Sequence, residues 1–237
     1  MNDPKMNDRR MRIAIIGGSG FIGTVLARHL LDAGHNVRIL DTAKSEIFPE
    51  LWVKTDILDK QTLIDNLQDI EAIYHLAAVH RDDIFPRSLY YDVNVEGTKN
   101  VMESASYHNI KTIIFTSTVA VYGLDSGESK ENDSPTPFND YGHSKLQAEK
   151  ALREWADNTD NSKLVLVRLV ATFGPGNKGN VRTLIDQIYS KKFIMIGSGQ
   201  NKKTIAYVEN VVDFLQNVMC LPAGSHLYNF ADKPDMT

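Results

Sequence analysis

The chain has 237 residues, of which 42% are apolar and 24% are charged, a balance typical of a globular protein with a substantial core. A mainly disordered chain is therefore excluded. The 26 basic and 30 acidic residues leave a net charge of −4, so no global basic field is available for nucleic acid.

The single cysteine excludes a disulfide framework and a Cys-rich zinc site, and it agrees with a reducing cytosol. The longest early apolar run, residues 13–16, is too short for a signal-peptide core or a membrane span. We therefore expect a soluble, cytoplasmic protein.

Short β-branched runs alternate with longer segments of helical spacing over residues 1–170. The runs with the character of buried parallel strands are residues 13–16, 37–40, 72–76, 112–116 and 164–169. The segments with helical spacing begin at Phe21, lie around Leu63, and cover residues 93–108 and 141–155. This alternation predicts a doubly wound α/β domain with a parallel sheet and right-handed crossovers.

The pattern changes after residue 170. A Gly-rich loop at 172–180 precedes a predicted helix over 181–190, a predicted strand over 193–196 with a turn at 197–199, and a predicted helix over 208–219. Residues 171–237 are too few for an independent domain. We interpret them as the incomplete start of a small substrate lobe that interleaves with the first domain.

A glycine-rich turn directly follows the first predicted strand. Gly17, Gly20 and Gly23 have the spacing G-x-x-G-x-x-G and open a predicted helix. Gly17 permits the tight turn, Gly20 lets the backbone approach a pyrophosphate, and Gly23 lets helix and strand pack closely. A glycine triplet alone would be a flexible connection. The flanking strand and helix favour a dinucleotide site at the helix N-terminus.

Carboxylates follow the predicted strand over 37–40 and a further strand that ends before residue 56. Asp41 lies 24 residues after Gly17, near the offset at which an acid receives the ribose hydroxyls of adenosine and repels a 2′-phosphate. NAD is therefore favoured over NADP, although Lys44 weakens this discrimination and a solvated strand-end acid is the alternative. Asp56 and Ile57 follow that further strand and would flank an adenine, with an ordinary strand-end turn as the alternative.

Tyr141 and Lys145 lie four residues apart, on one face of a predicted helix. An ammonium at that distance stabilises a phenolate, which makes tyrosine a usable general acid/base for an alcohol. The pair alone is also a common exposed helical pair. The hydroxyls of residues 116–118 strengthen the catalytic interpretation, because they end a strand and the carboxyl ends of parallel strands face the ligand crevice.

These motifs occur in one order, together with His75-Leu76-Ala77-Ala78 and Asn94. The chain thereby resembles the extended short-chain dehydrogenase/reductase family, whose members include nucleotide-sugar epimerases and dehydratases with a Rossmann fold. The resemblance implies a catalytic triad of Thr118, Tyr141 and Lys145. It also implies a set of NAD-binding positions, which include the glycine-rich turn and the strand-end carboxylates described above. These positions are Gly17, Gly20, Phe21, Ile22, Gly23, Asp41, Asp56, Ile57, Leu76, Ala77, Ala78, Asn94, Ser117, Tyr141 and Lys145.

A narrower likeness points to epimerases of that family that act on a diphosphate-linked N-acetylhexosamine. It is carried by the segments 78–94, 117–124, 137–141, 179–181, 195–197 and 206–210. The expected reaction is 4-epimerisation through transient oxidation at C4, in surface polysaccharide biosynthesis, with the sugar carried by a polyprenol or by UDP. Substrate contacts are expected from Arg81, Thr118, Asn180 and Lys203.

Some features depart from the family or leave alternatives open. Val119-Ala120 replaces the Asp-Glu pair of the 4,6-dehydratases, which argues against dehydration. The residues after Arg168 lack the Pro or Asn of many relatives. Arg81 or Arg87 would clamp a diphosphate, or would pair with a nearby aspartate. A reductase that releases its cofactor, and a non-catalytic NAD-binding regulator, are the competing functions.

Partners and metals complete the expectations. His75 and His80 have no third ligand at metal-site spacing, so no metal site is predicted. The lysine pairs at 191–192 and 202–203 are expected to be exposed to solvent. The alternative is that they contact an anionic membrane surface that carries a lipid-linked substrate. The family resemblance implies a homodimer through residues 93–108 and 141–155.

Overall fold

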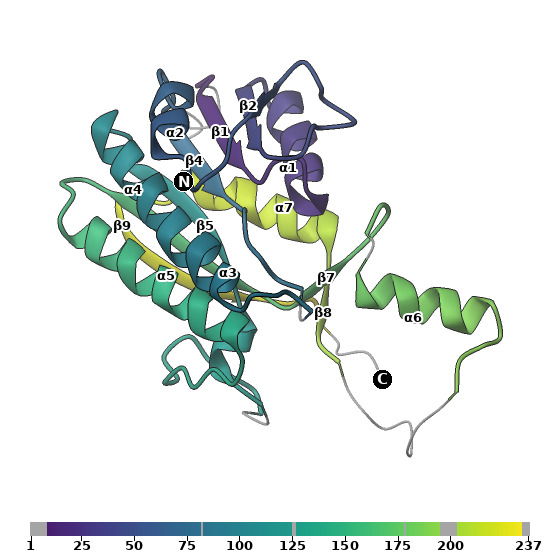
Figure 1. Cartoon of the computed structure of the whole chain (residues 1–237). Helices are drawn as coiled ribbons and strands as arrows, with labels where there is room; N and C mark the ends of the chain where they lie inside the picture. The colour runs from purple at the N-terminus through teal and green to yellow at the C-terminus, as the bar shows by residue number, and fades with distance from the viewer. Residues whose placement is uncertain (1–8, 82, 125–126, 178, 195–202, 234–237) are drawn as a thin grey trace, which may run out of the picture.

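The computed structural model describes residues 9–81, 83–124, 127–177, 179–194 and 203–233 (Figure 1). Its centre is a seven-stranded parallel sheet in the order β3-β2-β1-β4-β5-β6-β9. The strands are β1 (Arg12–Ile16), β2 (Asn36–Asp41), β3 (Trp52–Lys54), β4 (Ala72–His75), β5 (Thr112–Thr118), β6 (Lys163–Leu169) and β9 (Gly224–Phe230). The five strands predicted over residues 1–170 and the doubly wound fold class are confirmed.

Helices cover both faces of this sheet. The helices of the described chain are α1 (Phe21–Asp32), α2 (Lys60–Asn66), α3 (Ser88–Tyr91), α4 (Gly97–Tyr107), α5 (Asp140–Asp157), α6 (Asn180–Tyr189) and α7 (Val208–Asn217), of which α6 does not cover the sheet. The side chains of α2, α4 and α5 bury one face in a core with Ile16, Ile73 and Phe115. Those of α1 and α7 bury the other face with Ile15 and Tyr74. Apolar residues alternate between the two faces along each strand, which produces the two cores.

The predicted helix over 93–108 differs in detail from the observed one. The chain becomes helical earlier, at Ser88, and passes through a π-helical turn, η1 (Asp92–Glu96), before α4. Asn94 lies in this turn and is 1% exposed. The sequence analysis missed the earlier start because the apolar residues within 88–92 do not recur at helical spacing.

The strand order reverses on either side of β1. The chain runs from β1 outward to β2 and β3, then returns to β4 on the other side of β1 and continues to β5 and β6. Such a reversal leaves a crevice outside the carboxyl ends of the two central strands. The glycine-rich turn after β1 and the residues after β4 therefore lie at the same edge.

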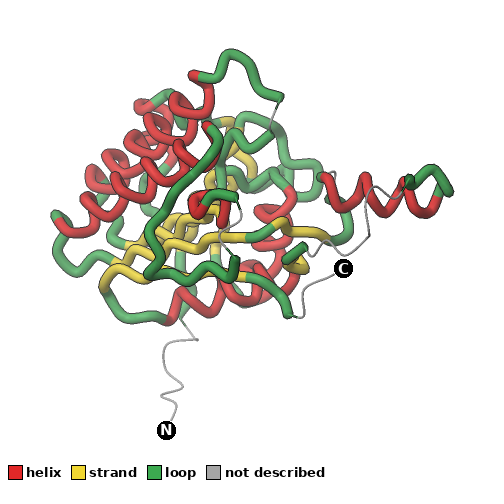
Figure 2. Tube along the Cα trace, turned by 90° about the horizontal axis from the view of Figure 1, so that it is seen from below, coloured by secondary structure: helices red, strands yellow, loops and turns green. Residues whose placement is uncertain are grey.

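Part of the segment after residue 170 forms a separate strand pair, and part of it joins the main sheet and its helical layer. β7 (Ala171–Phe173) and β8 (Ile205–Tyr207) form a small parallel pair, while β9 joins the main sheet beside β6 and α7 packs against α1. In contrast, α6 projects from the body of the molecule in both views (Figures 1 and 2). The boundary at residue 170 stays a prediction.

The strand expected over 193–196 is not observed where the structure can test it. Phe193 and Ile194 lie outside any strand, and residues 195–196 and the turn at 197–199 lie outside the described residues. The structure instead has β7, β8 and β9, which the sequence analysis missed. β7 and β8 are only three residues long, and β9 (GSHLYNF) has no β-branched residue.

Candidate functional site

The turn after β1 needs glycine at its first position. Gly17 has a φ of +81°, and a Cβ there would lie 2.6 Å from the backbone nitrogen of Ala77. Ala77 is held in place because its N–H donates to the carbonyl of Ile16 at 3.0 Å. The turn and the segment after β4 are thus in direct backbone contact, as a dinucleotide crevice requires.

The same turn leads directly into α1. A Cβ on Gly23 would lie 2.6 Å from the Cα of Gly18, so the first turn of the helix rests on the glycine-rich turn itself. The sequence analysis missed Gly18, where a Cβ would lie 2.8 Å from the carbonyl of Ile15. The N-cap is Gly20, and no side chain in the described part of the protein caps the helix, which leaves the N–H groups of its first turn available to an anion.

The carboxylate of Asp41 lies beside this turn, at the end of β2. Its Oδ2 accepts from the N–H of Ser19 at 3.1 Å, and its Oδ1 accepts from the N–H of Ala43 at 3.0 Å. Asp56 is exposed and accepts from Leu58 N–H at 2.9 Å, whereas Ile57 is 6% exposed in the core next to Gly97.

Asn94 ties the loop after β4 to α5. Its Oδ1 accepts from Val79 N–H at 2.8 Å, and its Nδ2 donates to Val79 O at 3.0 Å and to Ser144 Oγ at 2.9 Å. Ser144 in turn donates to the carbonyl of Tyr141 at 2.9 Å. Asn94 therefore fixes the segment that contains Leu76, Ala77 and Ala78 against the helix that carries Tyr141. The sequence analysis missed Ser144, whose only sequence signal is its place between the tyrosine and the lysine.

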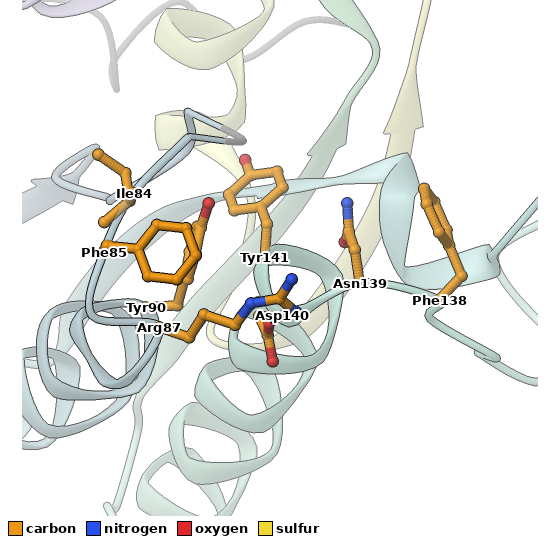
Figure 3. Close-up of a pocket in the computed structure, with 8 residues that line it drawn as sticks. All are labelled: Ile84, Phe85, Arg87, Tyr90, Phe138, Asn139, Asp140 and Tyr141. Carbon is orange, nitrogen blue, oxygen red and sulfur yellow. Dashed lines mark hydrogen bonds and ion pairs between the residues drawn. The ribbon is translucent and has the colours of Figure 1, made fainter.

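Tyr141 lies in the first turn of α5, which Asn139 caps by accepting from Gly142 N–H at 2.8 Å. Figure 3 shows the Tyr141 ring standing up from this turn, with its hydroxyl at the far end from the helix. Thr118 ends β5, is 8% exposed, and accepts from Ala120 N–H at 3.1 Å. The buried hydroxyl of the preceding Ser117 has no hydrogen-bond partner in the described part of the chain.

Lys145 is buried one turn beyond Tyr141. It is 1% exposed, and its Nζ lies 3.8 Å from the centre of the Phe115 ring on β5. Burial lowers the pKa of Lys145 to about 7, and the charge of Glu149 opposes this shift. The ammonium is therefore poised to change charge near neutral pH.

His75 packs against the same Phe115 ring and stays neutral. Its ring centre is 5.2 Å from that of Phe115, and its Nε2 lies 3.0 Å from Thr98 Oγ1. Burial and, to a smaller extent, the charge of Lys145 lower the pKa of His75 to about 3. Among the residues that the structure describes, no group of three His, Cys, Asp or Glu side chains is placed to hold a metal ion.

Among the expected substrate contacts, those of Arg81, Asn180 and Lys203 stay predictions. Arg81 makes a two-pronged pair with Asp83, at 3.1 and 2.7 Å, so the local pair is the arrangement observed. Lys203 is exposed, two residues before β8. The side chain of Asn180, at the start of α6, and all of Asp82 lie outside the described residues.

A pocket of about 240 Å³ lies beside Tyr141 (Figure 3). It is lined by Ile84, Phe85, Arg87, Tyr90, Phe138, Asn139, Asp140 and Tyr141. Within this lining Arg87 pairs with Asp140 at 2.9 Å, and Tyr91 donates to the same carboxylate at 3.0 Å. The pocket thus offers exposed aromatic rings and an ion pair next to the candidate acid/base.

The family model described as "NAD dependent epimerase/dehydratase family" matches residues 13–230. The chain belongs to this family. It is 44% identical over 233 residues to an N-acetyl-alpha-D-glucosaminyl-diphospho-ditrans,octacis-undecaprenol 4-epimerase of Escherichia coli O157:H7, covering 98% of this chain and 69% of that protein. It is 30% identical to a UDP-glucose 4-epimerase of Lactobacillus helveticus, over 72% of this chain and 54% of that protein.

Solved structures agree with this membership in the NAD-dependent epimerase/dehydratase family. "MoeE5 in complex with UDP-glucose and NAD" superposes with a TM-score of 0.86 at 25% identity, covering 95% of this chain and 77% of that one. The expected family, fold class and cofactor are confirmed. The chain spans only part of its relatives, from about half to about three quarters of their length.

The residues present fit NAD. The uncapped first turn of α1 suits a pyrophosphate, the Asp41 carboxylate at the rim suits ribose hydroxyls, and the turn between them consists of glycine and serine. The buried hydroxyls of Ser19 and Ser117 lack partners among the described residues, and both adjoin the crevice edge. The individual contacts assigned to Phe21, Ile22, Asp56, Ile57 and the other positions stay predictions.

The described residues include no helix that is both long and apolar enough to cross a membrane. Membrane contact through the lysine pairs stays a prediction, as does the expected dimer.

Proposed function

We propose that this protein is an NAD-dependent 4-epimerase of an N-acetylhexosamine joined through diphosphate to a polyprenol. The observation that carries the proposal is that Thr118 ends β5 and that α5, which carries Tyr141 and Lys145, packs against β5 and the turn after it. The 44% identity to the undecaprenol-linked 4-epimerase supports the polyprenol as the carrier.

The roles follow from where the groups lie. The phenolate of Tyr141 takes the proton from the C4 hydroxyl of the sugar, while Thr118 holds that oxygen at the end of β5. Lys145 stabilises the phenolate electrostatically from within the core. NAD, when bound, would supply a reversible hydride acceptor for C4 of the sugar, so the net redox change is nil. The cofactor would be held by Gly17, Gly20, Gly23 and Asp41.

Substrate recognition is assigned to the same edge of the molecule. Arg81, Asn180 and Lys203 would meet the diphosphate, and the pocket between Phe85 and Phe138 would adjoin the sugar site. Residues 171–237 would belong to the substrate lobe through α6, β7 and β8. The family resemblance supports a homodimer through η1, α4 and α5, acting at the inner face of the cell membrane.

The test offers the full-length protein UDP-N-acetylglucosamine and undecaprenyl-diphosphate-linked N-acetylglucosamine in parallel assays. We expect the lipid-linked sugar to be converted to its C4 epimer without net formation of NADH. Conversion of the UDP-sugar alone would reassign the carrier. Stoichiometric NADH consumption with a keto-sugar would identify a reductase instead.

A Tyr141→Phe variant tests the chemical role. Removal of the phenolic hydroxyl should lower turnover by at least about a thousandfold, because proton transfer at C4 has no substitute, while NAD binding measured by calorimetry is retained. Turnover at the wild-type rate would refute the assignment of Tyr141.

A further inference from the structure

A buried ion pair lies next to the segments that carry the candidate catalytic residues. Arg168 on β6 is 3% exposed, and its Nε and Nη2 donate to Oε1 and Oε2 of Glu149 at 2.9 and 2.6 Å. Its Nη1 donates to the hydroxyl of Tyr122 at 2.7 Å, and that hydroxyl donates to Asn229 Oδ1 on β9 at 2.9 Å. One guanidinium therefore joins α5, β6 and the segment after β5, and reaches β9 through Tyr122.

This network holds the two segments that carry the catalytic groups. Tyr122 ends the 3₁₀ turn η2 (Val119–Tyr122), whose N-cap is Thr118. Glu149 lies one helical turn beyond Lys145 on α5. Arg168 thereby connects the strand end with Thr118 to the helix with Tyr141 and Lys145.

The carboxylate of Glu149 also affects the charge of Lys145, because it raises the pKa of the lysine. The titratable groups described around the lysine are Tyr141 and Glu149 on α5 and His75 on β4, and β5 contributes the Phe115 ring. His75 is neutral, and Arg168 on β6 directs its charge at Glu149. Glu149 is therefore the carboxylate among these described groups, and its charge raises the pKa of Lys145 against the effect of burial.

A buried ion pair of this kind adds little net stability, because desolvation of both charges offsets their attraction. Its geometry has a clearer consequence for the site. We propose that Glu149, oriented by Arg168, is a positioning residue that keeps Lys145 protonated at the working pH and fixes α5 against the strand end that carries Thr118. This inference rests on the proposed function, because the charge of Lys145 matters to turnover only if Tyr141 is the acid/base.

The experiment follows the Lys145 ammonium in the NAD-bound full-length protein by ¹⁵N-lysine NMR, with the signal assigned by its loss in Lys145→Met. In Glu149→Gln, we expect the titration midpoint of Lys145 to fall by about 1 pH unit or more, since an opposite charge has been removed from its surroundings. The basic limb of the kcat/KM profile should move to lower pH by the same amount.

Tyr122→Phe is the matched control. It removes a hydrogen bond from the same guanidinium but no charge, so the midpoint and the basic limb should stay at their wild-type values. Glu149→Gln leaves Arg168 buried without its counter-ion, which can destabilise the fold. The double variant Glu149→Gln/Arg168→Met removes both charges and therefore provides a second test that avoids an unpaired buried charge. It should show a downward shift that is smaller than in Glu149→Gln, because the positive charge of Arg168 is removed together with the carboxylate.

Unchanged midpoints in both Glu149 variants would overturn the proposal, as would an equal shift in Tyr122→Phe. Loss of activity with no shift would also overturn it, since that result is expected of a merely structural pair. A shift in a protein that epimerises no sugar would refute the proposed function and still support the coupling.

Discussion

At the residue scale, Lys145 shows a conflict between stability and function. The ammonium is 1% exposed and faces an aromatic ring, which compensates only part of the hydration that it loses. Burial lowers its pKa to about 7, against a value near 10.4 in the unfolded chain. The folded state therefore binds fewer protons than the unfolded state between these values, and stability rises with pH across that window.

This conflict predicts a variant that is more stable and inactive. Lys145→Met replaces the ammonium by an apolar chain of similar length, so the melting temperature below pH 7 should rise by about 4 °C, or on the order of 1–2 kcal/mol. The advantage over the wild type should shrink as the pH is raised from 7 to 10, where the wild-type lysine is neutral in the folded state. Thermal melts at several pH values measure this, and an advantage that grew with pH would contradict the assigned shift.

At the scale of elements, the contact between the glycine-rich turn and α1 determines whether a dinucleotide can bind. The closest approach is at Gly23, where a Cβ would meet the Cα of Gly18 and the carbonyl of Gly17 at 2.6 and 2.7 Å. Both obstacles are backbone, so the helix itself would have to move. The uncapped N–H groups would then be displaced from the crevice.

Gly23→Ala should therefore weaken NAD binding by more than about tenfold, as measured by calorimetry, and destabilise the fold by at least about 1 kcal/mol. Gly34→Ala is a matched control at the other end of α1. Gly34 has a φ of +83°, and no heavy atom of the described chain lies within 4 Å of the position that a Cβ would take, so this change costs stability through backbone strain alone. Equal NAD affinities in the two variants would show that the turn does not position the ligand.

At the scale of the whole molecule, the last part of the described chain completes the core. β9 covers the edge of β6 along its whole length, from Lys163 opposite Gly224 to Leu169 opposite Phe230. Val211, Val212 and Leu215 of α7 are 0% exposed against α1 and the sheet, and Tyr74 donates to the carbonyl of Leu215 at 3.0 Å. These contacts come from residues beyond position 170.

A chain that ends at residue 170 should consequently fail to fold cooperatively. It would expose the β6 edge and the apolar surface beneath α7, at a cost of several kcal/mol. Circular dichroism should show no sharp thermal transition, while the full-length protein melts cooperatively. A cooperative transition in the shortened chain would instead establish residues 1–170 as an autonomous domain.

Features that depend on neighbours along the chain could be predicted from the amino-acid sequence. The β-branched runs predicted the first strands, the glycine spacing predicted the turn, and four-residue spacing placed Tyr141 and Lys145 on one helical face. Each of these patterns is local, because helical and strand periodicity act over a few residues. The family resemblance supplied the order of the motifs.

Contacts between distant residues became visible only in the folded molecule. The pairing of β9 with β6, the hydrogen bond from Tyr122 to Asn229 across 107 positions, and the pair of Arg168 with Glu149 have no periodic signal. They depend on strand order and register, which the packing of both helical layers sets together. The environment of Lys145, and with it the charge of the site, is for the same reason a property of the tertiary structure.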